Sequence, residues 1–133
     1  MKEILYLVLL VFLAMGVCTA QIPNLMGNWT GFEKGYDAEN GSYKSVENDS
    51  INLSFVEQRD RVFTGNVSYM YKGKAIVEAF AGAINPDNKT FYLTQIDKGY
   101  SIGTIVSDNK IDLIYLAEGG EGAATFEEYR RIK

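Results

Sequence analysis

From Gly27 to the C-terminus, the chain alternates short apolar runs with turn-forming residues. Ile51, Leu53 and Phe55 fall on one face of a predicted strand, and polar residues occupy the positions between them. Similar runs recur along the chain, and no window shows the longer period of an amphipathic helix. The pattern predicts an all-β domain, with strands at residues 28–35, 50–57, 62–71, 75–84, 90–97, 100–107, 110–116 and 124–132.

Most connections between these runs are short and rich in Gly, Asn and Asp, such as Lys72-Gly73 and Lys98-Gly99. Links of this length join antiparallel neighbours, because a parallel crossover needs about a dozen residues. We therefore predict an eight-stranded up-and-down meander that closes into a small barrel. The one long connection, from Tyr36 to Asp49, is expected to form a loop over the barrel mouth or an extra edge strand.

An aromatic residue stands two positions before a glycine in three of the predicted strands. Glycine weakens a strand interior, so its recurrence indicates sharply coiled strands in which a ring fills the space that a side chain would take. This curvature favours a closed barrel over a flat sandwich. The three triplets are Trp29-Thr30-Gly31, Phe63-Thr64-Gly65 and Phe80-Ala81-Gly82.

The first twenty residues differ from the rest of the chain. A nearly continuous apolar run from Ile4 to Val17 is followed by the small-residue stretch Cys18-Thr19-Ala20. This pattern predicts a signal peptide or signal helix over 1–20, cleaved before Gln21, and a single secreted or extracytoplasmic domain over 21–133. If the segment is retained, residues 4–20 would be the only contact with a membrane, at the cell surface. Acylation of Cys18 is a further alternative, although Val17 stands where a small residue is preferred.

The composition excludes several classes of function. The whole chain contains no histidine, and Cys18 is its one cysteine, so Ser-His-Asp and Cys-His nucleophiles and Cys/His zinc sites are not expected in the mature domain. The net charge of −4 without a basic run argues against nucleic-acid binding. We predict no metal, no cofactor and no enzymatic activity. The enzymatic alternative would use a carboxylate in or beside an apolar strand: Glu78, Asp97, Asp112 or Glu118.

The opening Gly27-Asn28-Trp29, together with Arg130 and Arg131 near the C-terminus, resembles the lipocalin and avidin group of barrels. In that group the tryptophan closes one end of the barrel and an arginine lies across its indole ring. The resemblance implies that Trp29 and Arg130 close the barrel here. The chain lacks the tryptophan row of avidins, because Trp29 is its single tryptophan, so biotin binding is not expected.

An eight-stranded barrel is either filled by its own side chains or keeps room for one small ligand. Aromatic residues predicted on the inner face could line such a pocket: Tyr69, Tyr71, Phe80, Phe91 and Tyr115. The main functional prediction is therefore a non-enzymatic binding module for a small apolar or aromatic ligand. The alternative is a protein-binding or inhibitor-type barrel that uses the strands between Phe91 and Leu116, which are apolar on both faces. The oligomeric state is left open.

Six of the nine asparagines begin an Asn-x-Ser/Thr triplet, whereas the Ser and Thr content alone predicts about one. Polar strand faces and turns account for part of this excess. The remainder is typical of surface N-glycosylation, which would make the protein a glycoprotein. The candidate acceptors are Asn28, Asn40, Asn48, Asn52, Asn66 and Asn88.

Overall fold

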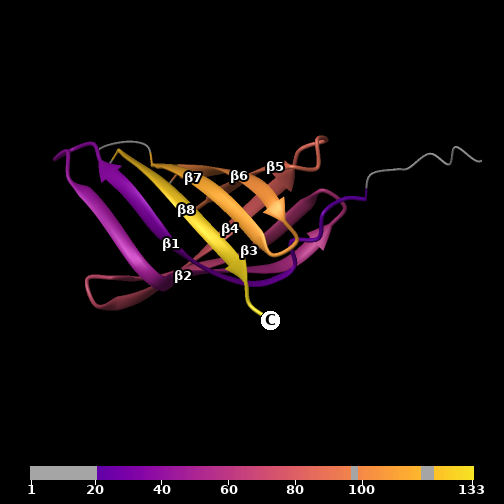
Figure 1. The fold of residues 1–133 in the computed structure, drawn as a ribbon, viewed down its shortest axis with the longest axis horizontal. Helices are drawn as coiled ribbons and strands as arrows, with labels where there is room; N and C mark the ends of the chain where they lie inside the picture. Colours follow the sequence, from indigo (N-terminus) through magenta and orange to yellow (C-terminus); the bar gives the residue numbers. More distant parts are fainter. Residues whose placement is uncertain (1–20, 97–98, 118–121) are drawn as a thin grey trace, which may run out of the picture.

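The computed structural model describes residues 21–96, 99–117 and 122–133, apart from the side chains of residues 48 and 49. Eight antiparallel strands form one closed barrel in which every strand pairs with its neighbours in sequence, and β1 also pairs with β8 (Figure 1). This confirms the predicted all-β meander. The predicted signal segment lies outside the described residues. Within those residues, no helix is long and apolar enough to cross a membrane.

The strands follow the predicted order closely. β3 and β4 are joined by Lys72 and Gly73, which both have positive φ, as a tight hairpin turn requires. The strands are β1 Gly27–Asp37, β2 Tyr43–Arg59, β3 Val62–Tyr71, β4 Lys74–Ile84, β5 Thr90–Gln95, β6 Gly99–Ser107, β7 Lys110–Ala117 and β8 Ala123–Arg131.

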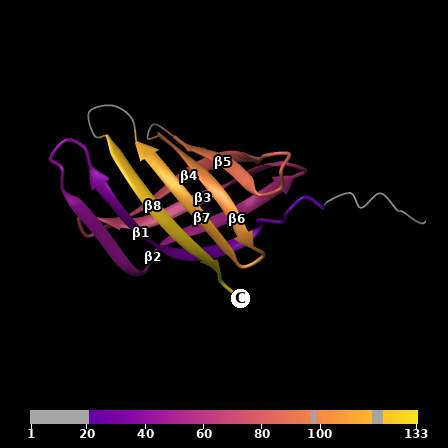
Figure 2. The same ribbon diagram turned by 45° about the horizontal axis from the view of Figure 1, so that its top comes forward.

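The long connection between Tyr36 and Asp49 is neither a loop over the mouth nor a separate edge strand. It is the first part of β2, which pairs with β1 from Tyr43 onward. The register is irregular, because Gly31 pairs with Ile51 whereas Glu33 pairs with Val46. This polar stretch lacks strict alternation, since the bulge interrupts the period of two. Figure 2 shows the two long strands side by side, extending beyond the rest of the barrel.

Aromatic rings pack over glycines of the neighbouring strand. Phe80 lies opposite Gly65 and Phe63 opposite Gly82, and a Cβ at either glycine would lie within 2.5 Å of the facing ring. The expectation that rings fill the space above glycines is therefore confirmed, with the ring coming from the adjacent strand. The Phe63 and Phe80 rings also pack edge-to-face against Phe55, each with its centroid 5.2 Å from that of Phe55. The three rings fill one end of the barrel interior.

The segment before β1 folds across the filled end of the barrel. Leu25 is buried, and its carbonyl accepts a hydrogen bond from the Trp29 indole at 3.0 Å. The guanidinium of Arg131 lies 4.2 Å from the centre of the Trp29 ring and donates to the carbonyls of Met26 and Asn24. Trp29 and an arginine thus close this end.

The arginine predicted for this role, Arg130, was the wrong one. Trp29 points inward, and along β8 the inward positions alternate through Tyr129 to Arg131. Arg130 therefore points outward, where it is exposed and forms an ion pair with Glu128. The one-residue difference decides the role because successive side chains of a strand point to opposite faces.

Candidate functional site

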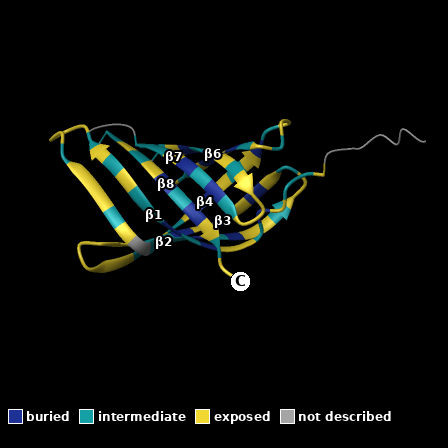
Figure 3. Ribbon diagram, viewed as in Figure 1, coloured by how far each residue is buried: buried dark blue, intermediate teal, exposed yellow. Residues whose placement is uncertain are grey.

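The two halves of the barrel interior differ in exposure. At the end closed by Trp29, the apolar side chains of the core are at most 6% exposed. Toward the β1–β2 hairpin, the inward positions are mostly partly exposed, so solvent reaches them (Figure 3). We call this second region the open half. Its inward residues are Glu33, Gly35, Asp37, Lys44, Val46, Tyr69, Ile76, Glu78, Gln95, Ser101, Tyr115, Thr125 and Glu127.

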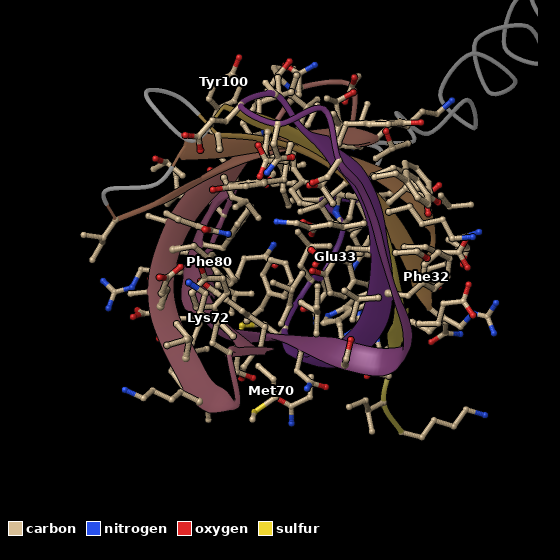
Figure 4. All side chains as sticks on the ribbon, turned by 90° about the vertical axis from the view of Figure 1, so that its left-hand side faces the viewer. Phe32, Glu33, Met70, Lys72, Phe80 and Tyr100 are labelled. Atoms are coloured by element: carbon tan, nitrogen blue, oxygen red, sulfur yellow. The ribbon has the colours of Figure 1, made fainter. Side chains whose placement is uncertain are left out.

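Figure 4 looks into the barrel from the open half. Glu33 and Phe80 lie on the inside of the ring of strands, on opposite walls, whereas Phe32, Met70 and Tyr100 lie on its outside. Phe80 is 2% exposed and belongs to the core. The open half therefore rests on an aromatic floor and has polar groups on its walls.

Two carboxylates face each other across the pair of strands that closes the barrel. Glu33 of β1 and Glu127 of β8 occupy directly paired positions, and both are on the inner face. Side chains at such positions have Cβ atoms roughly 5 Å apart. Glu127 is 8% exposed, and one of its oxygens accepts a hydrogen bond from the Tyr129 hydroxyl at 2.7 Å. The site thus contains a like-charge pair that is partly removed from water.

The surroundings shift the acid–base properties of these groups. Burial raises the pKa of Glu127 to about 7, and the charge of Glu33 adds to the rise, whereas the hydrogen bond from Tyr129 lowers this pKa. Burial also raises the pKa of Glu33, while the ammonium of Lys44 lowers it. The pKa of Tyr129 lies well above its ordinary value because of burial and the neighbouring Glu127. The Tyr129 hydroxyl therefore remains a donor at neutral pH.

The five aromatic residues predicted to bind a ligand occupy different places. Tyr69 and Tyr115 lie on the inner wall of the open half and are partly exposed. Phe80 and Phe91 are buried in the core, at 2% and 0% exposure. Tyr71, at the tip of the β3–β4 hairpin, is 53% exposed and lies beneath the ammonium of Lys72. The structure therefore places Tyr69 and Tyr115 on the inner wall of the open half, and it places Phe80 and Phe91 in the core and Tyr71 at the hairpin tip.

Sequence reasoning missed both members of the carboxylate pair. The four carboxylate candidates were chosen because they lie in or near apolar runs. Glu78 faces the interior, and Asp112 faces outward toward Lys110. Asp97 and Glu118 fall outside the described residues. The informative signal was the alternation itself. Glu33 follows Trp29 and Gly31 at intervals of two, and Glu127 precedes Tyr129 by two, so both share the inner face.

No group of three or more acidic, histidine or cysteine side chains within the described residues could hold a metal ion. The open half offers the facing carboxylates of Glu33 and Glu127, the carboxylate of Glu78, the ammonium of Lys44, phenol groups and an amide. Such a lining can orient a polar group of a ligand while the aromatic surfaces contact its apolar part.

The outer wall has a polar and an apolar side. The predicted acceptors Asn28 and Asn66 flank Ser54 in one cross-strand row on β1–β3, and both are exposed. Asn40 is exposed at the β1–β2 turn, Asn52 is partly exposed, and Asn88 accepts a hydrogen bond from Arg61. The side chain of Asn48 is not described. On β5–β8 a second row is apolar and consists of Tyr92, Ile102, Ile114 and Phe126.

No protein-family model and no curated protein sequence matches the chain. Solved structures do match it. A redesigned β-barrel has a TM-score of 0.59 at 12% identity and covers 82% of this chain and 92% of its own. An S-type phycobiliprotein lyase from Guillardia theta has a TM-score of 0.52 at 10% identity, covering 82% and 89%. A de novo designed fluorescence-activating β-barrel has a TM-score of 0.52 at 12% identity, covering 81% and 94%.

At these identities, the likeness is one of fold. Together with the closed eight-stranded meander, it confirms the small up-and-down β-barrel fold that the resemblance implied. The function has to be argued from the site, because one barrel architecture carries many functions.

Proposed function

We propose that the protein is a non-enzymatic binding barrel that acts outside the cytoplasm and holds a small ligand in its open half. The observation that carries the proposal is the change in exposure along the inner wall. Inward residues are buried at the Trp29 end and partly exposed toward the β1–β2 hairpin. A barrel whose only requirement was stability would gain from burying apolar side chains at both ends.

The lining of the open half fits a ligand with an apolar body and at least one polar group. Tyr69 and Tyr115 present partly exposed phenol rings on the inner wall from β3 and β7, and Phe80 belongs to the buried core of the barrel. Aromatic rings supply a large contact area, and phenol groups add hydrogen bonds that orient the ligand. Phe91 then stabilises the floor, and Tyr71 lies at the outer rim.

Binding is proposed ahead of catalysis because the open half holds no histidine or cysteine, and its acid–base groups are carboxylates and phenols. The chain has no histidine, and Cys18 lies in the predicted signal segment. One barrel with this fold is named as a lyase, so the fold itself is compatible with catalysis. The carboxylates of the open half are the groups that an enzymatic version would need.

The proposal can be tested by filling the open half. Thr125 lies inward and pairs with Gly35 in the same way that Tyr129 pairs with Gly31. Thr125→Phe would place a ring over Gly35 and occupy the open half. The control Ala124→Phe adds the same ring at the adjacent, exposed position, which points outward.

The neutral fluorescent probe N-phenyl-1-naphthylamine reports binding to both variants. We expect the original protein and Ala124→Phe to bind it equally, and Thr125→Phe to bind at least tenfold more weakly. Absence of binding to the original protein, or equal binding to all three, would refute the proposal. Native mass spectrometry of the protein purified from its own host would also report leader cleavage, glycan mass, oligomeric state and any retained ligand.

The apolar outer row favours a second candidate function, a protein-binding or inhibitor-type barrel. Tyr92 and Ile114 are each 49% exposed, and Phe126 is 43% exposed. Because they lie in one continuous cross-strand row, they form a single apolar patch. A large exposed apolar patch is typical of an interaction surface. A specific extracytoplasmic partner whose binding is lost in Ile114→Arg, with the open half unaffected, would support this function over the first.

A further inference from the structure

The pair formed by Glu33 and Glu127 is unfavourable in an empty barrel. Like charges directly opposite each other in a sheet destabilise it, and burial adds the cost of removing a carboxylate from water. These two residues are paired on the inner face, and Glu127 is more than nine-tenths buried. Something must compensate this arrangement when both groups are ionised.

No cation within the described part of the chain serves Glu127. Its neighbours are the hydroxyl of Tyr129 on its own strand, the carboxylate of Glu33 on β1, and the apolar Leu113 on β7. Lys44 pairs with Gly35 on the inner face and acts on Glu33. Its side chain is 65% exposed and forms an ion pair with Asp37 at 3.6 Å, and it does not act on Glu127. Glu127 keeps its proton up to about pH 7; above that pH its buried carboxylate has no counter-charge within the described residues, which points to a cation supplied from outside.

We propose that the ligand of the open half is an organic cation whose ammonium group lies between Glu33 and Glu127. This inference rests on the proposed function and specifies the chemical class of its ligand. An ammonium group provides charge and N–H donors for both carboxylates, and hydrogen bonds between ionised partners are the strong ones. The apolar part of the ligand would then lie toward Phe80 on the opposite wall (Figure 4).

A small organic cation fits this position better than a metal ion. Calcium takes six to eight oxygen ligands, whereas no cluster of three or more metal-binding side chains occurs within the described residues. The aromatic rings nearby are suited to a cation with an organic body, because the face of an aromatic ring attracts ammonium groups.

Three probes with one body and different charges test the inference: 2-phenylethylamine, 2-phenylethanol and 3-phenylpropionate, measured by calorimetry at pH 8. We expect the amine to bind at least tenfold more tightly than the alcohol, and the carboxylate to bind most weakly. The amine stays protonated at pH 6, so its advantage over the alcohol should shrink there as Glu127, whose pKa is about 7, takes up a proton.

Glu127→Gln and Glu33→Gln keep the shape of each side chain and remove its charge. Both should reduce amine affinity at least tenfold and leave alcohol affinity within about twofold. Glu128→Gln is the matched control, since Glu128 is adjacent on β8 but faces outward toward Lys110. The probe panel on the unchanged chain decides the question even if one variant fails to fold.

The outcomes separate this inference from the proposed function. Equal binding of amine and alcohol, with no effect of Glu127→Gln or Glu33→Gln, would overturn the cation and leave the binding barrel in place. Tighter binding of the carboxylate would also overturn it. If none of the three probes nor N-phenyl-1-naphthylamine binds, both proposals are wrong. A charge preference lost in both inner variants and kept in Glu128→Gln would support the inference.

Discussion

The buried carboxyl of Glu127 makes the stability of the barrel depend on pH near neutrality. Its pKa rises from 4.5 to about 7 in the folded chain, so the folded state holds this proton more tightly than the unfolded chain does. The associated stability is fully present below pH 4.5 and is lost as pH rises through about 7. At about 1.4 kcal/mol per pKa unit, the full difference is about 3 kcal/mol.

Glu127→Gln removes this dependence, because the amide stays neutral and can still accept the hydrogen bond from Tyr129. We expect the variant and the original chain to have similar free energies of unfolding at pH 5. At pH 8.5 the variant should be more stable by up to about 3 kcal/mol, a large share of the roughly 5–15 kcal/mol typical of a small domain. For a domain of this size the melting temperature would differ by about 10 °C.

Urea unfolding followed by circular dichroism at several pH values between 5 and 9 measures the difference. Glu128→Gln is again the control: the hydrogen bond from Lys110 lowers the pKa of Glu128, so its stabilising contribution is lost only in acid, below the range measured. If the difference in the free energy of unfolding between Glu127→Gln and the original chain is the same at every pH in this range, the pKa of Glu127 is not raised by burial as described above.

Two further predictions concern the end closed by Trp29. Arg131→Ala should lower the free energy of unfolding by roughly 2–4 kcal/mol, because it removes the contact with Trp29 and charged hydrogen bonds to backbone carbonyls. Arg130→Ala should lower the free energy of unfolding by under about 1 kcal/mol, and thermal unfolding of both variants measures the difference. Gly103→Ala should be strongly destabilising, since its Cβ would lie 2.1 Å from the Phe91 ring; Phe91→Leu in the same chain should restore part of the loss in urea unfolding.

Alternation along the chain was sufficient to predict the order of the strands and most of their bounds. It failed over Tyr43 to Asp49, where a bulge breaks the period of two and no apolar face marks the strand. The same rule, applied to single residues, would have separated Arg131 from Arg130. Residue type and proximity to apolar runs were weaker guides than the alternation of inward and outward positions along a strand. Glu33 was missed for this reason, although it shares its face with Trp29.

The depth to which the barrel is filled could not be predicted, because it depends on which residue stands opposite each inward glycine. Where an aromatic ring faces the glycine, as Tyr129 faces Gly31, the interior is solid. At Gly35 the facing residue is Thr125, too small to fill the same space. The open half thus begins where the pairing of glycine with a ring stops, and Glu33 and Glu127 lie between these two levels. The change from the Gly31–Tyr129 pair to the Gly35–Thr125 pair therefore accounts for the greater exposure of the inner wall toward the β1–β2 hairpin.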